Sequence, residues 1–140
     1  MINLDKKVRV ELAHRLHMEK RYNCAQAVSC TFADILNMDE ADIFRAAEAF
    51  GLGMGAMGTC GAVSGMALVI GLLNSDGNVE NPTTKRKCYR LISECHERFE
   101  KKNGTVICRE LKGIDTGKVI RGCNDCIGDA VEILCDVLNQ

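Results

Sequence analysis

The sequence lacks several of the features that usually indicate a binding function. It has no tryptophan, one proline and few aromatic residues (4%), and its net charge is −1. Without a basic excess, little is available to neutralise phosphates, so we expect no nucleic-acid binding. The core must be built from Leu, Ile, Val, Ala and Met, which suits packed helices better than short strands. No segment alternates apolar and polar residues over a sustained length, and no strand is predicted.

Long hydrophobic runs are also missing. The longest apolar stretch, residues 62–73, is interrupted by Ser64, Gly65 and Gly71, and it is shorter than the roughly 20 residues that cross a bilayer. Residues 1–20 are charged throughout and lack the apolar centre of a secretory signal. We therefore expect a cytoplasmic protein without membrane insertion.

Helical periodicity and capping residues predict an all-α protein, a single-domain bundle of five to six main helices spanning residues 1–140. Asn23 and Asp39 are good N-caps, Asn81 with Pro82 predicts another helix start, and Gly104 predicts a helix end. The main helices are expected at about 4–20, 23–36, 39–50, 60–73, 82–102 and 125–138, with a short helical turn at 108–112.

One glycine pattern precedes the predicted central helix, and a second lies within it. Residues 51–58 are rich in Gly and Met and form a connection that cannot be regular helix. Gly61 and Gly65 lie four residues apart and give this helix a smooth face that another helix can approach closely. Such an approach would let cysteines from neighbouring helix ends meet.

Against this background, nine cysteines are the exceptional feature. An odd number in a chain without an export signal argues against a framework of structural disulfides. In a reducing compartment, excess cysteine indicates metal binding or thiol chemistry. Four cysteines lie inside expected helices and are interpreted as small apolar core residues: Cys30, Cys88, Cys95 and Cys135.

Three other cysteines, Cys24, Cys60 and Cys108, are predicted in the first turn of a helix. Unpaired backbone N–H groups and the helix dipole favour an anion there. For a cysteine this favours the thiolate, which is both the nucleophile and the metal ligand. Cys123 lies just before the last helix and feels the same field more weakly. The alternative interpretation is buried cysteines that happen to begin helices.

Cys123 and Cys126 form a C-x-x-C motif, which can close a disulfide or supply two metal ligands. No second C-x-x-C accompanies it, so the sequence does not contain a four-cysteine zinc knuckle. Ile127 stands where covalent haem attachment needs histidine, so we expect no haem c.

Residues 53–58 match the pattern G-x-G-x-x-G, but helix rather than strand is predicted before them, so no nucleotide is expected. We interpret Gly55, Gly58 and Gly61 as positions where the backbone can come close to the Cys60 thiol or to a bound cofactor. A plain loop is the alternative.

Three histidines are candidate ligands by type, although a place at the surface or core edge is the simpler interpretation: His14, His17 and His96.

The order of these elements resembles the C_GCAxxG_C_C family, to which a redox role is ascribed. Residues 23–28 resemble its first element, residues 59–65 its C-G-A-x-x-G element and residues 108–113 its third. Cys123 resembles the fourth, and the similarity covers nearly the whole chain from Tyr22 to Leu138. Cys126 departs from the pattern, so the fourth site stays open between Cys123 and Cys126.

The resemblance implies a helical protein whose shared cysteines carry redox chemistry, and it leaves three hypotheses. In the first, the cysteines ligate an iron–sulfur cluster or zinc for electron transfer. In the second, they are the redox thiols of a metal-free dithiol/disulfide oxidoreductase. In the third, the chain is a non-catalytic interaction module, a homodimer or an accessory to a transporter, because family members are often encoded near transporter genes. The candidate redox thiols are Cys24, Cys60, Cys108 and Cys123, and Cys126 joins them as a candidate metal ligand.

Overall fold

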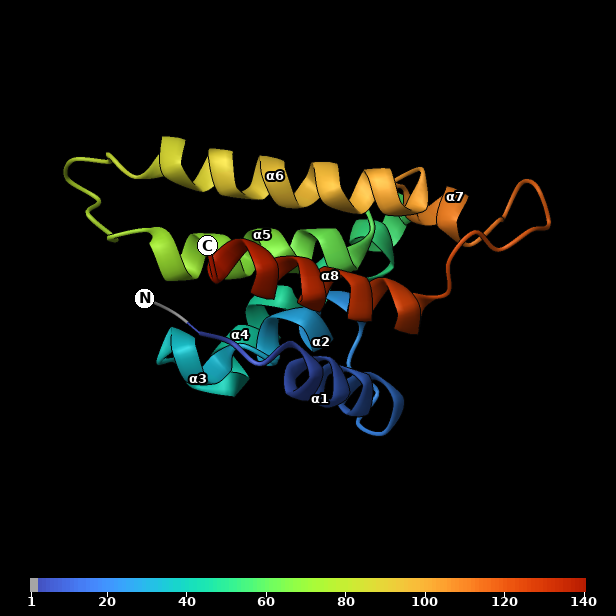
Figure 1. The fold of residues 1–140 in the computed structure, drawn as a ribbon, viewed down its shortest axis with the longest axis horizontal. Helices are drawn as coiled ribbons and strands as arrows, with labels where there is room; N and C mark the ends of the chain where they lie inside the picture. Colours follow the sequence, from blue (N-terminus) through green and yellow to red (C-terminus); the bar gives the residue numbers. More distant parts are fainter. Residues whose placement is uncertain (1–2) are drawn as a thin grey trace.

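The computed structural model describes residues 3–140, which form helices without a strand, as predicted (Figure 1). The described residues form eight α-helices, so the five to six main helices expected are too few, although six of the eight have seven residues or more. Two short helical turns, η1 (Glu48–Phe50) and η2 (Gly53–Met57), precede the central helix. The helices are α1 (Lys6–Met18), α2 (Cys24–Cys30), α3 (Ala33–Leu36), α4 (Glu40–Ala47), α5 (Gly61–Asn74), α6 (Lys85–Asn103), α7 (Cys108–Leu111) and α8 (Cys123–Leu138).

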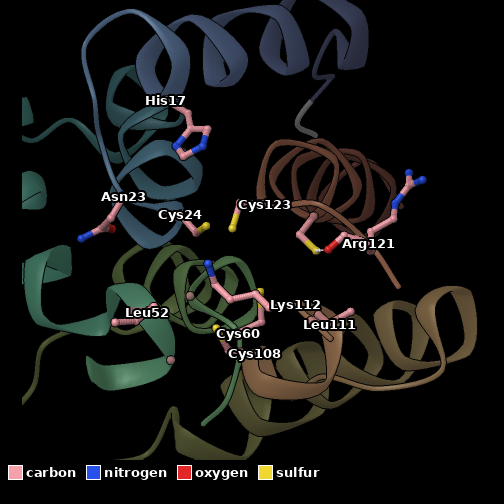
Figure 2. A pocket seen from close by; sticks show the side chains of 13 residues that line it. His17, Asn23, Cys24, Leu52, Cys60, Cys108, Leu111, Lys112, Arg121 and Cys123 are labelled. Atoms are coloured by element: carbon pink, nitrogen blue, oxygen red, sulfur yellow. Dashed lines mark hydrogen bonds between the residues drawn. The ribbon is translucent and has the colours of Figure 1, made fainter. Parts of the chain in front are cut away.

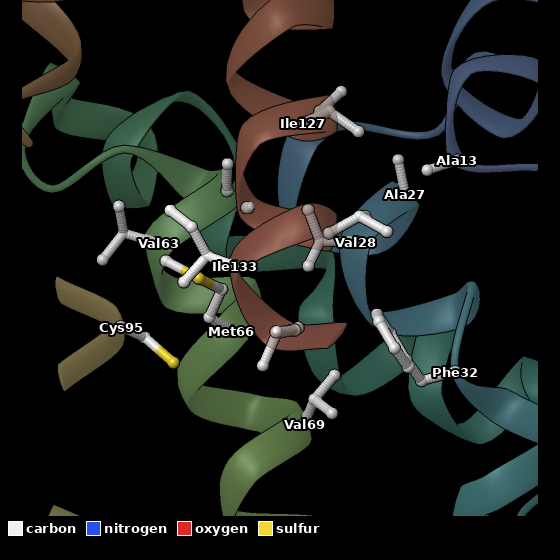
Figure 3. Close-up of a cluster of buried hydrophobic side chains, with 14 of the residues drawn as sticks. Ala13, Ala27, Val28, Phe32, Val63, Met66, Val69, Cys95, Ile127 and Ile133 are labelled. Atoms are coloured by element: carbon white, nitrogen blue, oxygen red, sulfur yellow. The ribbon is translucent and has the colours of Figure 1, made fainter. Parts of the chain in front are cut away.

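The helices are arranged in three layers. The long helix α6 packs on α5 and α8, and these two pack on α2, with α1 against α8 (Figure 1). The core between the layers holds fully buried side chains such as Phe32, Met66, Val69 and Ile127 (Figure 3). Burial of each such side chain contributes about 1.5–3 kcal/mol. Among residues 3–140, none of the helices is long and apolar enough to cross a membrane.

Helices α2 and α5 approach each other closely along the two predicted glycines. A Cβ atom on Gly65 would lie 3.0 Å from Cβ of Val28 and 3.1 Å from the backbone oxygen of Ala25. A Cβ atom on Gly61 would lie 3.2 Å from Cβ of Cys24. The predicted smooth face is therefore confirmed, and it brings the start of α5 against the start of α2.

We expect Gly65→Ala to destabilise the protein by about 1–3 kcal/mol, because the added methyl group meets backbone atoms of α2 that cannot move away cheaply. Gly71→Ala, on the same helix, is the matched control, because a Cβ atom there has no neighbour within 4 Å. That substitution should stabilise the helix by up to about 1 kcal/mol. Urea unfolding of both variants measures the difference, and a shift in the same direction for both would contradict the close approach.

Two predicted helix boundaries are wrong. Helix α6 begins at Lys85, with Thr84 as its N-cap, rather than after Asn81. The reason is local: the side-chain oxygen of Asn78 accepts from the backbone N–H of Asn81 and holds it in a turn. The single helix predicted for residues 23–36 is broken between α2 and α3, where the Thr31 hydroxyl donates to the backbone oxygen of Ala27 and competes with helix continuation.

A buried carboxylate joins the end of α6 to α8. Asp129 is only 3% exposed. It accepts two hydrogen bonds from the Arg121 guanidinium, at 2.9 and 3.0 Å, and one from Asn103, and it pairs with Lys102 at 2.7 Å. Burial acts to raise the pKa of Asp129, but these partners outweigh it and hold the pKa below its usual value. The network fixes Arg121 immediately before α8 begins.

Candidate functional site

Five cysteines converge on one cavity of about 220 Å³ (Figure 2). They come from segments far apart in the sequence. Three of them are buried and two are half-buried. The cavity therefore collects all of the cysteines that the sequence singled out for chemistry: Cys24, Cys60, Cys108, Cys123 and Cys126.

Each of the four shared cysteines stands at a helix start. Cys24, Cys108 and Cys123 are the first residues of α2, α7 and α8, so the prediction for Cys24 and Cys108 is confirmed. Helix α8 begins two residues earlier than the predicted start at about residue 125, so Cys123 is its first residue rather than a residue just before it. Cys60 is the N-cap of α5 rather than a residue of its first turn. In the long helices α5 and α8, this position exposes the sulfur to free backbone N–H groups and the positive end of the dipole.

A short backbone pairing places Cys60 beside Cys108. Thr59 and Ile107 form an isolated antiparallel bridge. The N–H of Cys60 donates to the oxygen of Val106 and the N–H of Cys108 donates to the oxygen of Gly58, both at 2.7 Å. Because successive side chains alternate in extended pairing, the two cysteines that follow the bridge leave on the same face. The bridge therefore directs both sulfurs into the cavity.

A capping box holds the start of α2 at the other side of the cavity. The Asn23 side chain accepts from the N–H of Gln26 at 2.9 Å, and the Gln26 side chain accepts from the N–H of Asn23 at 3.0 Å. Asn23 also donates to the backbone oxygen of Glu48. Together with the contact between Gly61 and Cys24, these bonds fix the position of the Cys24 thiol.

The half-buried thiols of Cys24 and Cys123 form an outer pair. The Cys24 thiol donates a hydrogen bond to the Cys123 sulfur, and this bond is the main reason that the pKa of Cys123 falls from 9.0 to about 5. The Lys112 ammonium adds to the effect. The same hydrogen bond, with burial, raises the pKa of Cys24 well above its usual value. The pair thus shares one proton, with the thiolate on Cys123.

Cys60 and Cys126 form an inner pair, and both are buried. The neighbouring Cys126 thiol lowers the pKa of Cys60, and the backbone N–H groups of Ala62 and Val63 act in the same direction. The Cys126 thiol itself donates to the backbone oxygen of Arg121 at 3.9 Å. The pKa of Cys126 is raised by the same contact and by burial. The two cysteines of the C-x-x-C motif are therefore partners of other cysteines rather than of each other. Cys108 has no thiol partner among the described residues, and burial raises its pKa.

Several side chains that sequence analysis did not assign to the site also line the cavity, among them Lys112 and His17. Lys112 is half-buried, and Figure 2 shows its amine pointing toward the sulfurs of Cys24 and Cys123. His17 also lines the cavity, and its Nδ1 lies 2.8 Å from the backbone oxygen of Tyr22. A carbonyl oxygen only accepts, so Nδ1 carries the proton of this hydrogen bond. The lysine within residues 108–113 could have been noticed, but nothing in the sequence placed His17 here.

The remaining cysteines behave as predicted for core residues. Cys30, Cys95 and Cys135 are buried, at 3% exposure or less, and Cys88 is half-buried. Burial raises the pKa of Cys30 and of Cys95 to about 12, and that of Cys135 to about 11. These thiols stay protonated at neutral pH and are poor nucleophiles.

The three glycines predicted to approach a cofactor are placed differently from one another. Gly61 lines the cavity, Gly58 binds the Cys108 amide through its carbonyl oxygen, and Gly55 faces open space. Gly53, which the prediction did not single out, lines the cavity, and a Cβ atom on it would lie 3.0 Å from Cβ of Cys108. Its φ of 57° is in the left-handed region, where glycine is favoured. The connection is not regular helix, as predicted.

Within residues 3–140, no three His, Cys, Asp or Glu side chains are arranged to hold a metal ion. The sulfurs are grouped in pairs instead. The ligand role of these sulfurs toward zinc, which needs four donors around one point, stays a prediction. An iron–sulfur cluster holds its cysteines around a larger core, so the ligand role of the five cysteines toward such a cluster stays a prediction.

A comparison with family models matches residues 22–137 to a model described as "Putative redox-active protein (C_GCAxxG_C_C)". The match covers most of the chain. The chain belongs to the C_GCAxxG_C_C family. Neither curated proteins nor solved structures give a match. Within this C_GCAxxG_C_C domain lie all five cavity cysteines, whereas His17 precedes the matched region.

The low pKa of Cys123 predicts how this C_GCAxxG_C_C protein reacts with iodoacetamide. Alkylation of Cys123 should rise with pH to a midpoint near 5 and be nearly flat above about 7, because the thiolate is the nucleophile. Lys112→Met should move the midpoint to higher pH, since the ammonium stabilises the thiolate. Lys85→Met, an exposed lysine on α6, is the control. Mass spectrometry of labelled peptides gives the rates, and a midpoint for Cys123 near 9 would contradict the assignment.

Proposed function

We propose that the chain is a dithiol–disulfide redox protein in which Cys123 is the attacking thiolate and Cys24 the resolving thiol. One observation carries the proposal: Cys123 combines partial exposure, a depressed pKa and a hydrogen-bonded thiol partner. An accessible thiolate beside a second thiol is the arrangement that exchange with a disulfide requires. The family description supports a redox role and does not name the reaction.

In the proposed reaction, the Cys123 thiolate attacks one sulfur of a substrate disulfide. The substrate S–S bond breaks, and one substrate thiolate leaves while a mixed disulfide forms. Cys24 then attacks the Cys123 sulfur, giving its proton to the leaving thiolate and releasing the second substrate thiol. The substrate disulfide gains two electrons, one proton from Cys24 and one proton from solvent, which the first leaving thiolate takes up. Cys24 and Cys123 lose the two electrons and become a disulfide. Lys112 stabilises the thiolate before the attack.

The inner pair provides a second dithiol next to the first. Cys60 has its own lowered pKa, and its charge interacts with both sulfurs of the outer pair. Exchange between the two pairs would pass two electrons from Cys60 and Cys126 to the outer disulfide, re-forming the outer dithiol. We therefore include the inner pair in the proposed site as an internal reductant.

Disulfide mapping after controlled oxidation tests the proposal. Under mild diamide treatment, the Cys24–Cys123 bond should form first and then pass by exchange to Cys60–Cys126. With excess diamide both bonds should be present together. Cys108 and the interior cysteines should stay reduced. Formation of a Cys123–Cys126 bond first, or no disulfide at all within the cavity, would overturn the assignment.

A second candidate function is electron transfer through an iron–sulfur cluster, with ligands drawn from the five cavity cysteines. The number of cysteines favours it, because Cys108 lines the cavity and has no role in either thiol pair. A cluster would supply one-electron transfer at this position. Anaerobic purification with an absorption spectrum and iron analysis of the same sample separates the two candidates: a colourless, iron-free protein with four oxidisable thiols supports the dithiol function.

A further inference from the structure

The loop between α7 and α8, residues 112–122, exposes apolar side chains beside the cysteine cavity. Ile114, Val119 and Ile120 are 47%, 67% and 55% exposed. Most exposed apolar residues are isolated and need no explanation, but these three share one short loop. In Figure 1 the loop projects from the end of the molecule where α8 begins.

Internal bonds give this loop a defined shape. The N–H of Gly117 donates to the oxygen of Gly113 at 2.8 Å, and that of Ile120 donates to the oxygen of Leu111 at 2.9 Å. A Cβ atom on Gly113 would lie 2.1 Å from the backbone oxygen of Lys118, so the two arms of the loop touch. The apolar side chains are therefore held in place rather than free to collapse onto the surface.

A groove of about 350 Å³ runs along this loop to the cysteine cavity. Ile114 and Val119 form its apolar part. Gly122, which has no side chain, lines the groove next to the start of α8. The groove shares three residues with the cavity: Lys112, Arg121 and Cys123. The attacking sulfur proposed above thus stands where the groove and the cavity meet.

The groove carries positive charge and no carboxylate lines it among the described residues. The guanidinium of Arg121 is compensated by Asp129. Lys112 has no carboxylate partner within residues 3–140, and its charge faces Cys123. Lys118, on the same loop, is likewise unpaired in that part of the chain and is exposed. An acidic group next to the apolar part would complement this charge.

We propose that the groove docks an extended segment of a partner polypeptide, whose disulfide exchanges with Cys123. The segment places an apolar side chain between Ile114 and Val119 and an acidic residue near Lys112 and Lys118. This inference rests on the proposed dithiol function and adds the substrate class, an acidic polypeptide disulfide. A small disulfide would need only the cavity, whereas the apolar groove extends beyond it and gives a partner chain a surface on which to bind.

Two substrates test the proposal in the full-length protein. One is a peptide in which a disulfide is flanked by Glu and Leu, and the other is hydroxyethyl disulfide, which is small and uncharged. Val119→Glu should lower kcat/KM for the peptide by about tenfold or more, because it places a carboxylate in the apolar part of the groove next to the peptide's own acidic residue. It should leave reduction of hydroxyethyl disulfide within about twofold. Val79→Glu is the control, since Val79 is 85% exposed on the loop at the opposite end of the molecule.

A binding measurement keeps the two proposals separable. A fluorescent version of the peptide with serine in place of cysteine should bind to the wild type and about tenfold more weakly to Val119→Glu and Ile114→Glu. If neither disulfide is reduced but this difference in binding persists, the dithiol function fails and the docking groove stands. Equal binding to all variants, or an equal loss of reduction for both substrates, would overturn the groove.

Discussion

Cys123→Ser should abolish disulfide reduction, lowering the rate by roughly a thousandfold or more, since no other thiol in the cavity is both accessible and ionised at neutral pH. Cys60 also has a lowered pKa but is only 5% exposed. Cys24→Ser should behave differently: it keeps the attacking thiolate and removes the resolving thiol, so a mixed disulfide between Cys123 and the substrate accumulates. Intact-mass spectrometry detects this adduct.

Cys88→Ser is the matched control for both variants, because Cys88 is half-buried on α6 and lies outside the cavity. It should change the rate by no more than about twofold. If Cys123→Ser retained the wild-type rate, Cys123 could not be the nucleophile. If Cys24→Ser turned over normally without trapping an adduct, the resolving role would belong to another thiol.

Asp129→Asn should lower the free energy of unfolding by about 2–3 kcal/mol, because the substitution leaves Lys102 and Arg121 side by side without their anion. Asp136→Asn is the control. Asp136 pairs with Lys6 at 2.9 Å, but it is 44% exposed, and such surface pairs contribute about 1 kcal/mol or less. Urea unfolding at neutral pH compares the two. Equal losses of unfolding free energy in the two variants would show that burial of the Asp129 network adds nothing to stability beyond a surface ion pair.

The pKa of Asp129 also fixes the pH at which this stabilisation disappears. Its folded pKa lies below the usual value of 3.8, so its contribution is complete above that value. As the pH falls through the folded pKa, the carboxylate gains a proton and the contribution is lost. The difference in stability between wild type and Asp129→Asn should therefore shrink in strong acid and stay constant above about pH 5.

The shifted pKa of Cys123 predicts a second pH dependence of the free energy of unfolding, at higher pH than that of Asp129. Its folded pKa of about 5 lies below the unfolded value of 9.0, so between these two the unfolded chain binds a proton that the folded chain lacks. Stability contributed by Cys123 therefore rises with pH across this window and is lost as pH falls through about 5. Comparing the pH dependence of the free energy of unfolding between the wild type and Cys123→Ser separates the contribution of Cys123 from those of other groups.

Much of the fold could be predicted from the sequence because local chemistry decides it. Asn23 and Asp39 cap α2 and α4 with their side chains, and Gly104 ends α6 with a φ of 82°. The glycine face of α5 could also be predicted, because the absence of side chains at Gly61 and Gly65 allows another helix to approach closely. The start of α6 could not, because the Asn78 side chain redirects the backbone before Asn81 reaches a helix.

The membership of the site could be predicted better than its internal arrangement. Cys24, Cys60 and Cys108 could be selected from the sequence because each lies at a predicted helix start. Stabilisation of a thiolate there depends only on residues within one helical turn. The pairing of Cys123 with Cys24 depends on how α8 lies against α2, which no local pattern encodes. For the same reason the C-x-x-C spacing suggested a Cys123–Cys126 pair, whereas tertiary packing gives each cysteine a different partner.

The outer pair joins residues that lie near opposite ends of the chain. A bond between Cys24 and Cys123 would close a ring containing most of the polypeptide, and long rings restrict a denatured chain most strongly. Electron transfer at this one position would therefore change how much conformational freedom the whole chain gains when it melts. The melting temperature of the protein should then report its oxidation state, so that an active-site event becomes readable as a property of the entire molecule.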